Sequence, residues 1–328
     1  MYVGKDLSFS LMWQFARVNL FWTLGISLVA VCLYSFAGFR FIAIPFLPVG
    51  TIGTAVAFFI GFKNNQAYDR MWEARKLWGS ITNSSRQFAI YLNSVMDDRE
   101  QVSYLLHKHV AWVNILRLQL RRNIPWATNK DNIHQRAVGD QKELEAFDAG
   151  LLAILEANGK AQYFELMRSR ANPANFLLKS QAEQLTALKS SGQIDGFEHQ
   201  DLMQILGQFL DQQGGCERIK TTPLFRQYST FSRYFVKIFI FLLPFGLLRD
   251  LQALVSWGAW LVIPFSLLIS WVFYTMEQIG EYSENPFDNA INDIPMSTIC
   301  RNIEADIREL LEEQDIPPRL QPVNNILL

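Results

Sequence analysis

The chain has 328 residues, half of them hydrophobic and 19% charged, with a formal net charge of −1. This near-neutral balance argues against a nucleic-acid-binding protein with a broad basic surface. Three cysteines lie far apart in the sequence without a Cys-x-x-Cys pair. A disulfide framework or structural zinc site is therefore not expected, and the soluble part is expected to be cytosolic.

Four stretches are apolar enough to cross a bilayer, which needs roughly 20 apolar residues. They are residues 18–39, 41–62, 234–248 and 251–276. The third is the weakest because it contains Lys237, which lies near its start, where a long side chain can reach the interface. We expect two membrane hairpins, with tight turns near residues 38–40 and 249–250.

The second stretch passes into a charged, aromatic segment without an obvious break. No glycine or proline lies between Gly61 and Gly79. We therefore expect one helix to leave the bilayer and continue into water.

Basic residues near the ends of the stretches predict the orientation. Lys5 and Arg17 precede the first stretch. Five more follow the second: Lys63, Arg70, Arg75, Lys76 and Arg86. Because Lys and Arg concentrate on the cytoplasmic side, both termini and the long middle region are expected there. The expected organisation is an N-terminal segment and first hairpin (1–62), a helical cytoplasmic region (63–233), a second hairpin (234–276) and a cytoplasmic helix with a tail (277–328).

The region outside the membrane reads as helical, so the expected fold class is an all-α membrane protein. Leucines and Phe147 recur at helical spacing over residues 144–155. Helix breaks are expected at 123–125, at Asn172-Pro173 and at Gly214-Gly215. Asp293-Ile294-Pro295 is typical of a helix start, and that helix is expected to reach about Glu313.

Two neighbouring faces of the second stretch differ in chemistry. Gly53, Ala57 and Gly61 form a row of small residues that lets another helix approach closely. The adjacent row consists of Thr54, Phe58 and Phe62. Such a row can form a hydrophobic constriction in a pore, or it can face lipid or fill a packing gap. Spacing alone favours the second interpretation.

Three blocks of sequence resemble the bacterial members of the bestrophin family. They run from Gly61 to Gly79, from Gly214 to Pro223, and over Glu284-Asn285-Pro286-Phe287. Their order and spacing fit, and the resemblance covers nearly the whole chain. The signature residues that we single out are Arg70, Trp72, Glu73, Arg75, Asn285, Pro286 and Phe287.

The resemblance implies a homopentameric ion channel with a central pore lined by the second helix of each subunit. It assigns the three rings of a narrow hydrophobic neck to Thr54, Phe58 and Phe62. Thr54 departs from the aliphatic residue usual in the family, so the outermost ring is expected to be wider or wetter. A second, cytosolic aperture is assigned to Ile194 in Ser191-Gly192-Gln193-Ile194-Asp195; an ordinary apolar residue at a helix start is the alternative.

Calcium-activated animal relatives carry consecutive acids after Asn-Pro-Phe, but here residues 288–293 read Asp-Asn-Ala-Ile-Asn-Asp. Oxygen ligands are too sparse for Ca²⁺, so no metal site and no cofactor are expected. Asp288 and Asn289 are instead expected to turn the chain after Pro286.

The sign of the conducted ion stays open, because animal and plant relatives conduct chloride and other anions whereas bacterial relatives have been associated with monovalent cations. Glu277, Glu281 and Glu284 share a helix face and would attract cations if they faced a pore; a solvated or ion-paired face is the more common arrangement.

The sequence contains none of the common catalytic motifs, so we expect no enzyme and no catalytic residues. The expected partners are small monovalent ions, the lipid bilayer and further copies of the chain. Two other functions remain open. A secondary transporter would place broken helices and polar groups at mid-membrane, and Pro244 and Pro264 lack such polar company. A membrane-anchored scaffold without ion flux would have no axial pore.

Overall fold

The computed structural model describes residues 1–6, 9–122, 140–323 and 325–327. Over these residues the regular structure is helical, and the only strand-like pairings are isolated bridges such as Tyr2 with Ile326. The all-α class is confirmed for this part of the chain. The expected break at residues 123–125 lies outside the described residues.

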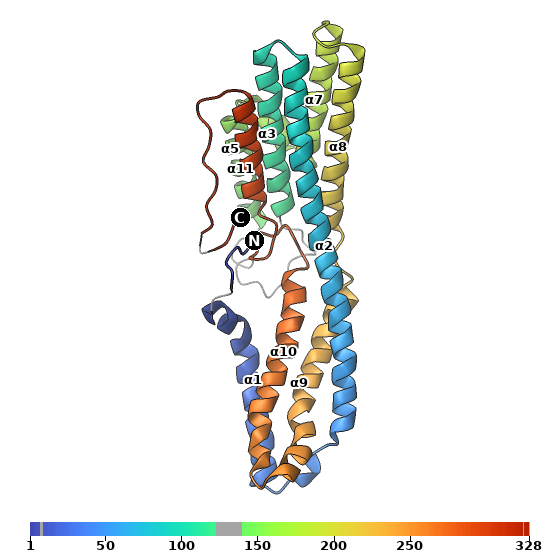
Figure 1. Cartoon of the computed structure of the whole chain (residues 1–328), viewed down its shortest axis with the longest axis vertical. Helices are drawn as coiled ribbons and strands as arrows, with labels where there is room; N and C mark the ends of the chain where they lie inside the picture. The colour runs from blue at the N-terminus through green and yellow to red at the C-terminus, as the bar shows by residue number, and fades with distance from the viewer. Residues whose placement is uncertain (7–8, 123–139, 324, 328) are drawn as a thin grey trace. The chain divides into compact units, whose positions relative to one another are not determined.

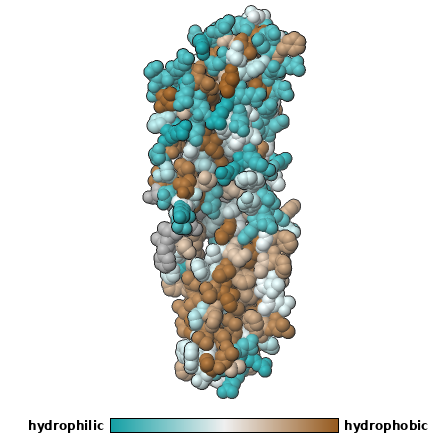
Figure 2. Space-filling model, viewed as in Figure 1, coloured by the Kyte–Doolittle hydropathy of each residue, from teal (hydrophilic) through white to brown (hydrophobic). Residues whose placement is uncertain are grey.

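The chain divides into two compact units. The first, which we call the apolar unit, contains residues 4–70 and 224–284. The second, the polar unit, contains residues 1–3, 71–223 and 285–328. Hydrophobic residues gather on the visible surface of the first and hydrophilic residues on that of the second (Figure 2). The limits expected at residues 62, 233 and 276 each fall inside a helix, so none is a break in secondary structure.

The apolar unit contains α1 (Phe9–Ser35), the first half of α2 (Phe46–Val95), α9 (Arg226–Leu254) and α10 (Val262–Tyr282) (Figure 1). Four segments are long and apolar enough to cross a membrane: Phe15–Ser35, Arg40–Val95, Arg226–Leu254 and Gly258–Tyr282. Four membrane-length helical segments are thus confirmed, but the bounds differ: the expected second stretch becomes α-helical only at Phe46, and the expected fourth stretch, 251–276, begins within α9, while α10 starts at Val262. The helix expected to continue past Phe62 is also confirmed, because α2 has 50 residues.

One of the two expected hairpin turns is confirmed, and the other is not. The first lies near Gly38, which has a left-handed φ of 70°, and is confirmed. The second, expected at residues 249–250, is wrong. There α9 continues through Arg249 and Asp250 to Leu254, because a charged pair at a helix end does not by itself stop the helix. The turn comes just before Gly258, where a Cβ atom would lie 1.9 Å from the Leu251 carbonyl oxygen.

Close packing of α2 on α9 organises the core of the apolar unit. Val49, Val56 and Ile60 pack with apolar residues of α9. A Cβ atom on Gly53 would lie 2.6 Å from the Phe239 ring, so the absence of a side chain permits this approach. The small-residue row is therefore a packing face at Gly53. At Gly61 a Cβ atom would meet nothing within 4 Å among the described residues.

The polar unit is a bundle around a large aromatic and aliphatic core. Besides the second half of α2 it contains α3 (Arg99–Arg121), α5 (Asp140–Ala157), α6 (Phe164–Arg168), α7 (Pro173–Ser190), α8 (Gly196–Thr221) and α11 (Met296–Leu310) (Figure 1). The helices expected over residues 144–155 and after Pro295 are confirmed. Trp78, Trp112 and Phe209 are fully buried at its centre.

Local capping explains several helix starts in the polar unit. Asn172 accepts a hydrogen bond from the Asn175 backbone NH and is followed by a proline, which confirms the expected boundary. The other expected boundary, Gly214-Gly215, is wrong because both glycines lie inside α8. A Cβ atom on Gly215 would lie 2.8 Å from the Leu77 side chain. This glycine permits close contact with α2 and does not end the helix.

Candidate functional site

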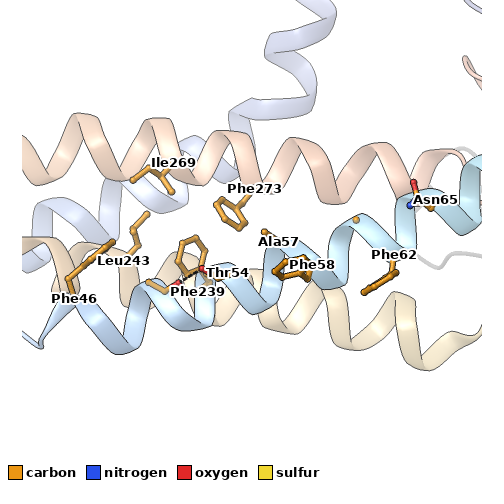
Figure 3. A pocket seen from close by; sticks show the side chains of 13 residues that line it. Phe46, Thr54, Ala57, Phe58, Phe62, Asn65, Phe239, Leu243, Ile269 and Phe273 are labelled. Atoms are coloured by element: carbon orange, nitrogen blue, oxygen red, sulfur yellow. Dashed lines mark hydrogen bonds between the residues drawn. The ribbon is translucent and has the colours of Figure 1, made fainter.

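A groove of about 920 Å³ runs along the apolar unit between α2, α9 and α10 (Figure 3). Thr54, Phe58 and Phe62 come from successive turns of α2 and line it. The other labelled lining residues are Phe46, Ala57, Asn65, Phe239, Leu243, Ile269 and Phe273. Apart from Thr54 and Asn65, the lining side chains are apolar, so the groove offers permeating or bound molecules almost no hydrogen bonds.

The two phenylalanines of the row are unusually accessible. Phe58 is 68% exposed and Phe62 is 62% exposed. Neither is covered by another described part of the same chain, although aromatic side chains normally bury most of their surface. Their surroundings must therefore come from outside the subunit, as lipid, another protein or the lumen of an oligomer.

Thr54 is also exposed, but its hydroxyl group is already occupied. The Oγ1 atom donates a hydrogen bond to the Gly50 carbonyl oxygen, 3.0 Å away and one turn earlier in α2 (Figure 3). A helical threonine bonded in this way has no proton left to donate. Thr54 therefore adds an acceptor to the row but no donor.

A buried ion pair lies next to the row. Lys63 directly follows Phe62, and its Nζ atom is 2.6 Å from Oε1 of Glu277 on α10. The Lys63 side chain is fully buried, and that of Glu277 is 2% exposed. The next residue, Asn64, donates from Nδ2 to the Met276 carbonyl oxygen over 2.9 Å. These contacts fix the rotation of α2 against α10 at the level of Phe62.

The glutamates at the end of α10 form an ion-paired face. Glu277 pairs with Lys63. Glu281 contacts Arg233 at 2.8 Å, and Glu284 contacts Arg226 at 3.8 Å. Burial raises the pKa of Glu284, which weakens its negative charge further. Of the two arrangements that the sequence left open, the structure has the ion-paired one.

The first signature block also serves the fold. Arg70 donates from Nε to the Glu284 carbonyl oxygen at 3.1 Å, within the apolar unit. In the polar unit, Glu73 forms an ion pair with Arg218, and the Arg75 guanidinium lies 5.9 Å from the centre of the Trp72 ring. The arginines are thus held by acids, carbonyls and rings of the same chain.

The third signature block, which contains Asn285-Pro286-Phe287, anchors the chain that leaves α10. Phe287 is fully buried in the core of the polar unit, and the Pro286 carbonyl oxygen accepts a hydrogen bond from the Ile294 NH group over 3.1 Å. Asn285 is half-buried. Asn289 has a left-handed φ of 66°, which confirms the expected turn.

The acidic residues after the third block form contacts within the fold. Asp288 lies 2.7 Å from the Lys220 ammonium group. Asp293 is buried and accepts a hydrogen bond from the Ala290 NH group, and burial raises its pKa to about 6. Within the described ranges, no three His, Cys, Asp or Glu side chains are grouped as metal ligands.

Ile194, the expected aperture residue, lies in the polar unit just before α8. Its side chain is 3% exposed and belongs to the core. The aperture assignment stays a prediction, and this burial argues against it, because a side chain that narrows a passage must face that passage. Phe197, three residues later, was not predicted as a site residue. Its side chain is 81% exposed.

The four apolar helices and the lined groove define an all-helical membrane protein. Comparison with known proteins identifies its family. The sequence model of the Bacterial/Fungal Bestrophin protein family matches residues 11–309. The chain belongs to the bestrophin family.

Curated relatives cover most of the chain. The Voltage-dependent anion channel-forming protein YneE of Salmonella typhi is 29% identical over 310 residues, which are 94% of this chain and 90% of that protein. The Voltage-dependent anion channel-forming protein RSc3414 of Ralstonia nicotianae is 32% identical and covers 82% of this chain and 78% of its own. A similarly named protein of Mesorhizobium japonicum, mll4386, is 30% identical over 84% of this chain and 77% of its own length.

A solved structure shares the fold. The crystal structure of a bacterial bestrophin homologue from Klebsiella pneumoniae superposes with a TM-score of 0.77 at 24% identity. The match covers 91% of this chain and 99% of that one. The fold class of the chain is therefore that of the bestrophins.

Proposed function

We propose that this protein is a homopentameric ion channel whose pore is lined by α2 of each subunit, with Thr54, Phe58 and Phe62 forming a hydrophobic neck. The observation that carries the proposal is the exposed aromatic row in a chain of the bestrophin family. A ring of exposed phenylalanines around an axis would form a constriction that dewets and so controls ion passage.

The need for several subunits follows from the groove. Its apolar walls come from three helices of one chain, and the phenylalanines stand on an open side. One chain has too few helices to enclose a passage along this row. Further copies of the same chain would complete the wall and cover the exposed rings, as a cyclic assembly does.

We propose small monovalent anions, chloride among them, as the conducted ions. The curated relatives bear names that describe anion channel-forming proteins. The ion-paired glutamates of α10 also weaken the case for cations, because a neutralised carboxylate attracts no counter-ion. Monovalent cations remain the alternative, and a reversal potential distinguishes the two.

We further propose a bacterial inner membrane location, with both termini and the polar unit on the cytoplasmic side. The basic residues before α1 and along α2 after Phe62 support this orientation. Accessibility of single cysteines to a membrane-impermeant label in intact cells and in lysed cells tests it. Labelling of the polar unit in intact cells would reverse the assignment.

Conductance of the purified protein in planar bilayers tests the channel. Wild type should conduct, and Phe58→Ala/Phe62→Ala should conduct more because the neck is wider and wetter. Phe21→Ala is a matched control, since Phe21 is 64% exposed but lies on α1, away from the groove. The channel is disproved if neither wild type nor the double variant conducts. The neck assignment fails if Phe21→Ala and the double variant have equal effects.

The sign of the reversal potential in asymmetric NaCl decides between anions and cations. A potential near the chloride equilibrium value supports the proposal, and one near the sodium value supports the cation alternative. Saturable, stoichiometric flux without channel currents would instead indicate a transporter. An oligomer without any flux would indicate a scaffold.

A further inference from the structure

Two lysines are buried side by side in the polar unit, away from the groove. Lys108 lies on α3 and is 2% exposed. Lys160 lies between α5 and the short helix η2 (Ala161–Tyr163) and is 3% exposed. Lysine is almost never fully buried unless its charge is paired, so the surroundings of these two require an explanation.

Both ammonium groups lie close to one aromatic ring. The Nζ atom of Lys160 is 3.5 Å from the centre of the Tyr104 ring, and that of Lys108 is 4.9 Å from the same point. Lys108 is also 5.4 Å from the centre of the Tyr163 ring. The hydroxyl oxygens of the two tyrosines are 3.1 Å apart. Two positive charges and two hydroxyl groups therefore share one small region.

Neutral side chains accept hydrogen bonds from only one of the two ammonium groups. Lys108 donates to Ser180 Oγ at 3.1 Å and to Gln184 Oε1 at 2.8 Å, and it also hydrogen-bonds with the Tyr163 hydroxyl group, so each of its three protons has a partner. Lys160 has no hydrogen-bond acceptor within the described residues. Neither lysine forms a salt bridge with a carboxylate of the described chain.

The charge of the cluster is not balanced by these contacts. A cation over an aromatic ring gains less free energy than the burial of an ammonium group costs. Burial lowers the pKa of Lys160 to about 8 and also lowers the pKa of Lys108. With a pKa of about 8, Lys160 is still protonated at neutral pH.

Partly exposed polar side chains surround the two ammonium groups. Tyr104, Tyr163, Ser180 and Gln184 are each half-buried, so polar groups around the ammonium groups reach the surface. The protons of Lys160 are the donors without an acceptor among the described residues, and the Lys108 ammonium group lies beside the same ring. Several donors next to a second positive charge suit an anion with several acceptor oxygens better than a monatomic anion.

We propose that this cluster, consisting of Tyr104, Lys108, Lys160, Tyr163, Ser180 and Gln184, binds a doubly charged oxyanion, namely inorganic phosphate or the phosphate group of a small monoester. Two negative charges would balance the two ammonium groups, whereas a single carboxylate would leave one unbalanced. The proposal is independent of ion conduction, because the cluster lies in the polar unit.

Calorimetric titration of the full-length protein in detergent with inorganic phosphate, at constant ionic strength and pH 7, tests the site. Wild type should bind phosphate saturably, and Lys160→Met should weaken binding at least tenfold. Lys189→Met is the matched control, since Lys189 is an exposed lysine on α7, and it should bind as wild type does. Unfolding temperatures without phosphate establish that each variant is folded. Tyr104→Phe, which keeps the ring, should weaken binding a few-fold.

The proposal is overturned if wild type shows no saturable heat with phosphate, or if Lys160→Met binds as tightly as wild type. It is also overturned if chloride at the same concentrations gives the same heat. A parallel titration with glycerol phosphate separates the two sources: tighter binding than phosphate supports a monoester, and weaker binding supports the free ion.

Discussion

The ammonium nitrogen of Lys63 lies 2.6 Å from a carboxylate oxygen of Glu277, and both side chains are buried. Lys63 is the neighbour of Phe62, so this pair connects the end of the aromatic row on α2 to α10. A buried pair does little for net stability compared with apolar residues, but it penalises any arrangement in which one charge is left alone. The pair therefore selects the rotation of α2 that presents Phe62 to the groove.

Loss of one member of this pair should destabilise the protein strongly. Lys63→Met and Glu277→Gln each leave a buried charge without its counter-charge, and we expect a cost of about 3–5 kcal/mol for the remaining charge. Chemical unfolding in detergent measures it. Arg86→Met is the control, because the Arg86–Asp306 pair is partly exposed and should cost under about 1 kcal/mol. Equal losses for Lys63→Met and Arg86→Met would contradict the argument.

Gly280→Ala should disturb the contact between α10 and α2. A Cβ atom at this position would lie 2.1 Å from Oδ1 of Asn64, so either the Asn64 side chain must turn away and lose its hydrogen bond to the Met276 carbonyl oxygen, or one helix must shift. We expect a loss of about 1–3 kcal/mol, measured by thermal unfolding. At Gly79, in contrast, a Cβ atom would meet nothing within 4 Å in the described part of the chain. Gly79→Ala should therefore be neutral or should stabilise the helix by about 0.5–1 kcal/mol. Similar losses in both variants would refute the steric reason.

Ile194→Ala and Phe197→Ala should separate packing from pore lining. Ile194 is buried in the core, so its truncation should cost about 2–5 kcal/mol. Phe197 is mostly exposed, and its truncation should change stability by only about 0.5 kcal/mol. In the proposed channel, a change of conductance in a fully folded Phe197→Ala variant would indicate that this exposed side chain lines the passage. A stable, normally folded Ile194→Ala variant with altered conductance would restore the aperture assignment to Ile194.

Lys160→Met should stabilise the protein at neutral pH in phosphate-free buffer. The folded pKa of Lys160, about 8, is below its ordinary value of 10.5, so the folded state disfavours the charged form. The unfolded chain then binds more protons between these two values, and wild-type stability gains with rising pH there. The advantage of the variant, of order 1–3 kcal/mol, should be full below pH 8 and should shrink between pH 8 and 10.5.

Unfolding curves of both proteins across this range provide the measurement. Lys108, Tyr104 and Tyr163 contribute equally to the pH dependence of the unfolding free energy in both proteins where they keep their environment. The difference between the two curves then reports on Lys160. An advantage that grows above pH 8 would have the wrong sign and would refute the assigned cause.

The sequence predicted those features that depend on neighbouring residues. Four apolar stretches were sufficient to place the helices of the apolar unit, and the absence of Gly or Pro after Gly61 was sufficient for the length of α2. The Asn172-Pro173 boundary followed from capping chemistry. Gly214-Gly215 was misjudged because the same residue type ends helices and permits close helix packing. Only the position of Leu77 distinguishes the two roles.

The charged and polar sites could not be predicted from the sequence, because their residues lie far apart in the chain. Glu277 and Lys63 are 214 residues apart, so their pairing is visible only in three dimensions. The lysine cluster likewise collects side chains from α3, α7 and the loop after α5, and no local motif marks it. The aromatic row itself was visible from spacing, but its exposure was not.

The paired glutamates of α10 have a consequence for the order in which ions would pass. Since Glu277, Glu281 and Glu284 each have a basic partner, ions at the proposed neck would meet little net charge from this stripe. In the proposed channel, the barrier beside Phe58 and Phe62 would then be governed by the free energy of shedding water. Large, weakly hydrated anions shed water most readily, so thiocyanate and iodide would permeate ahead of chloride, and fluoride would come last.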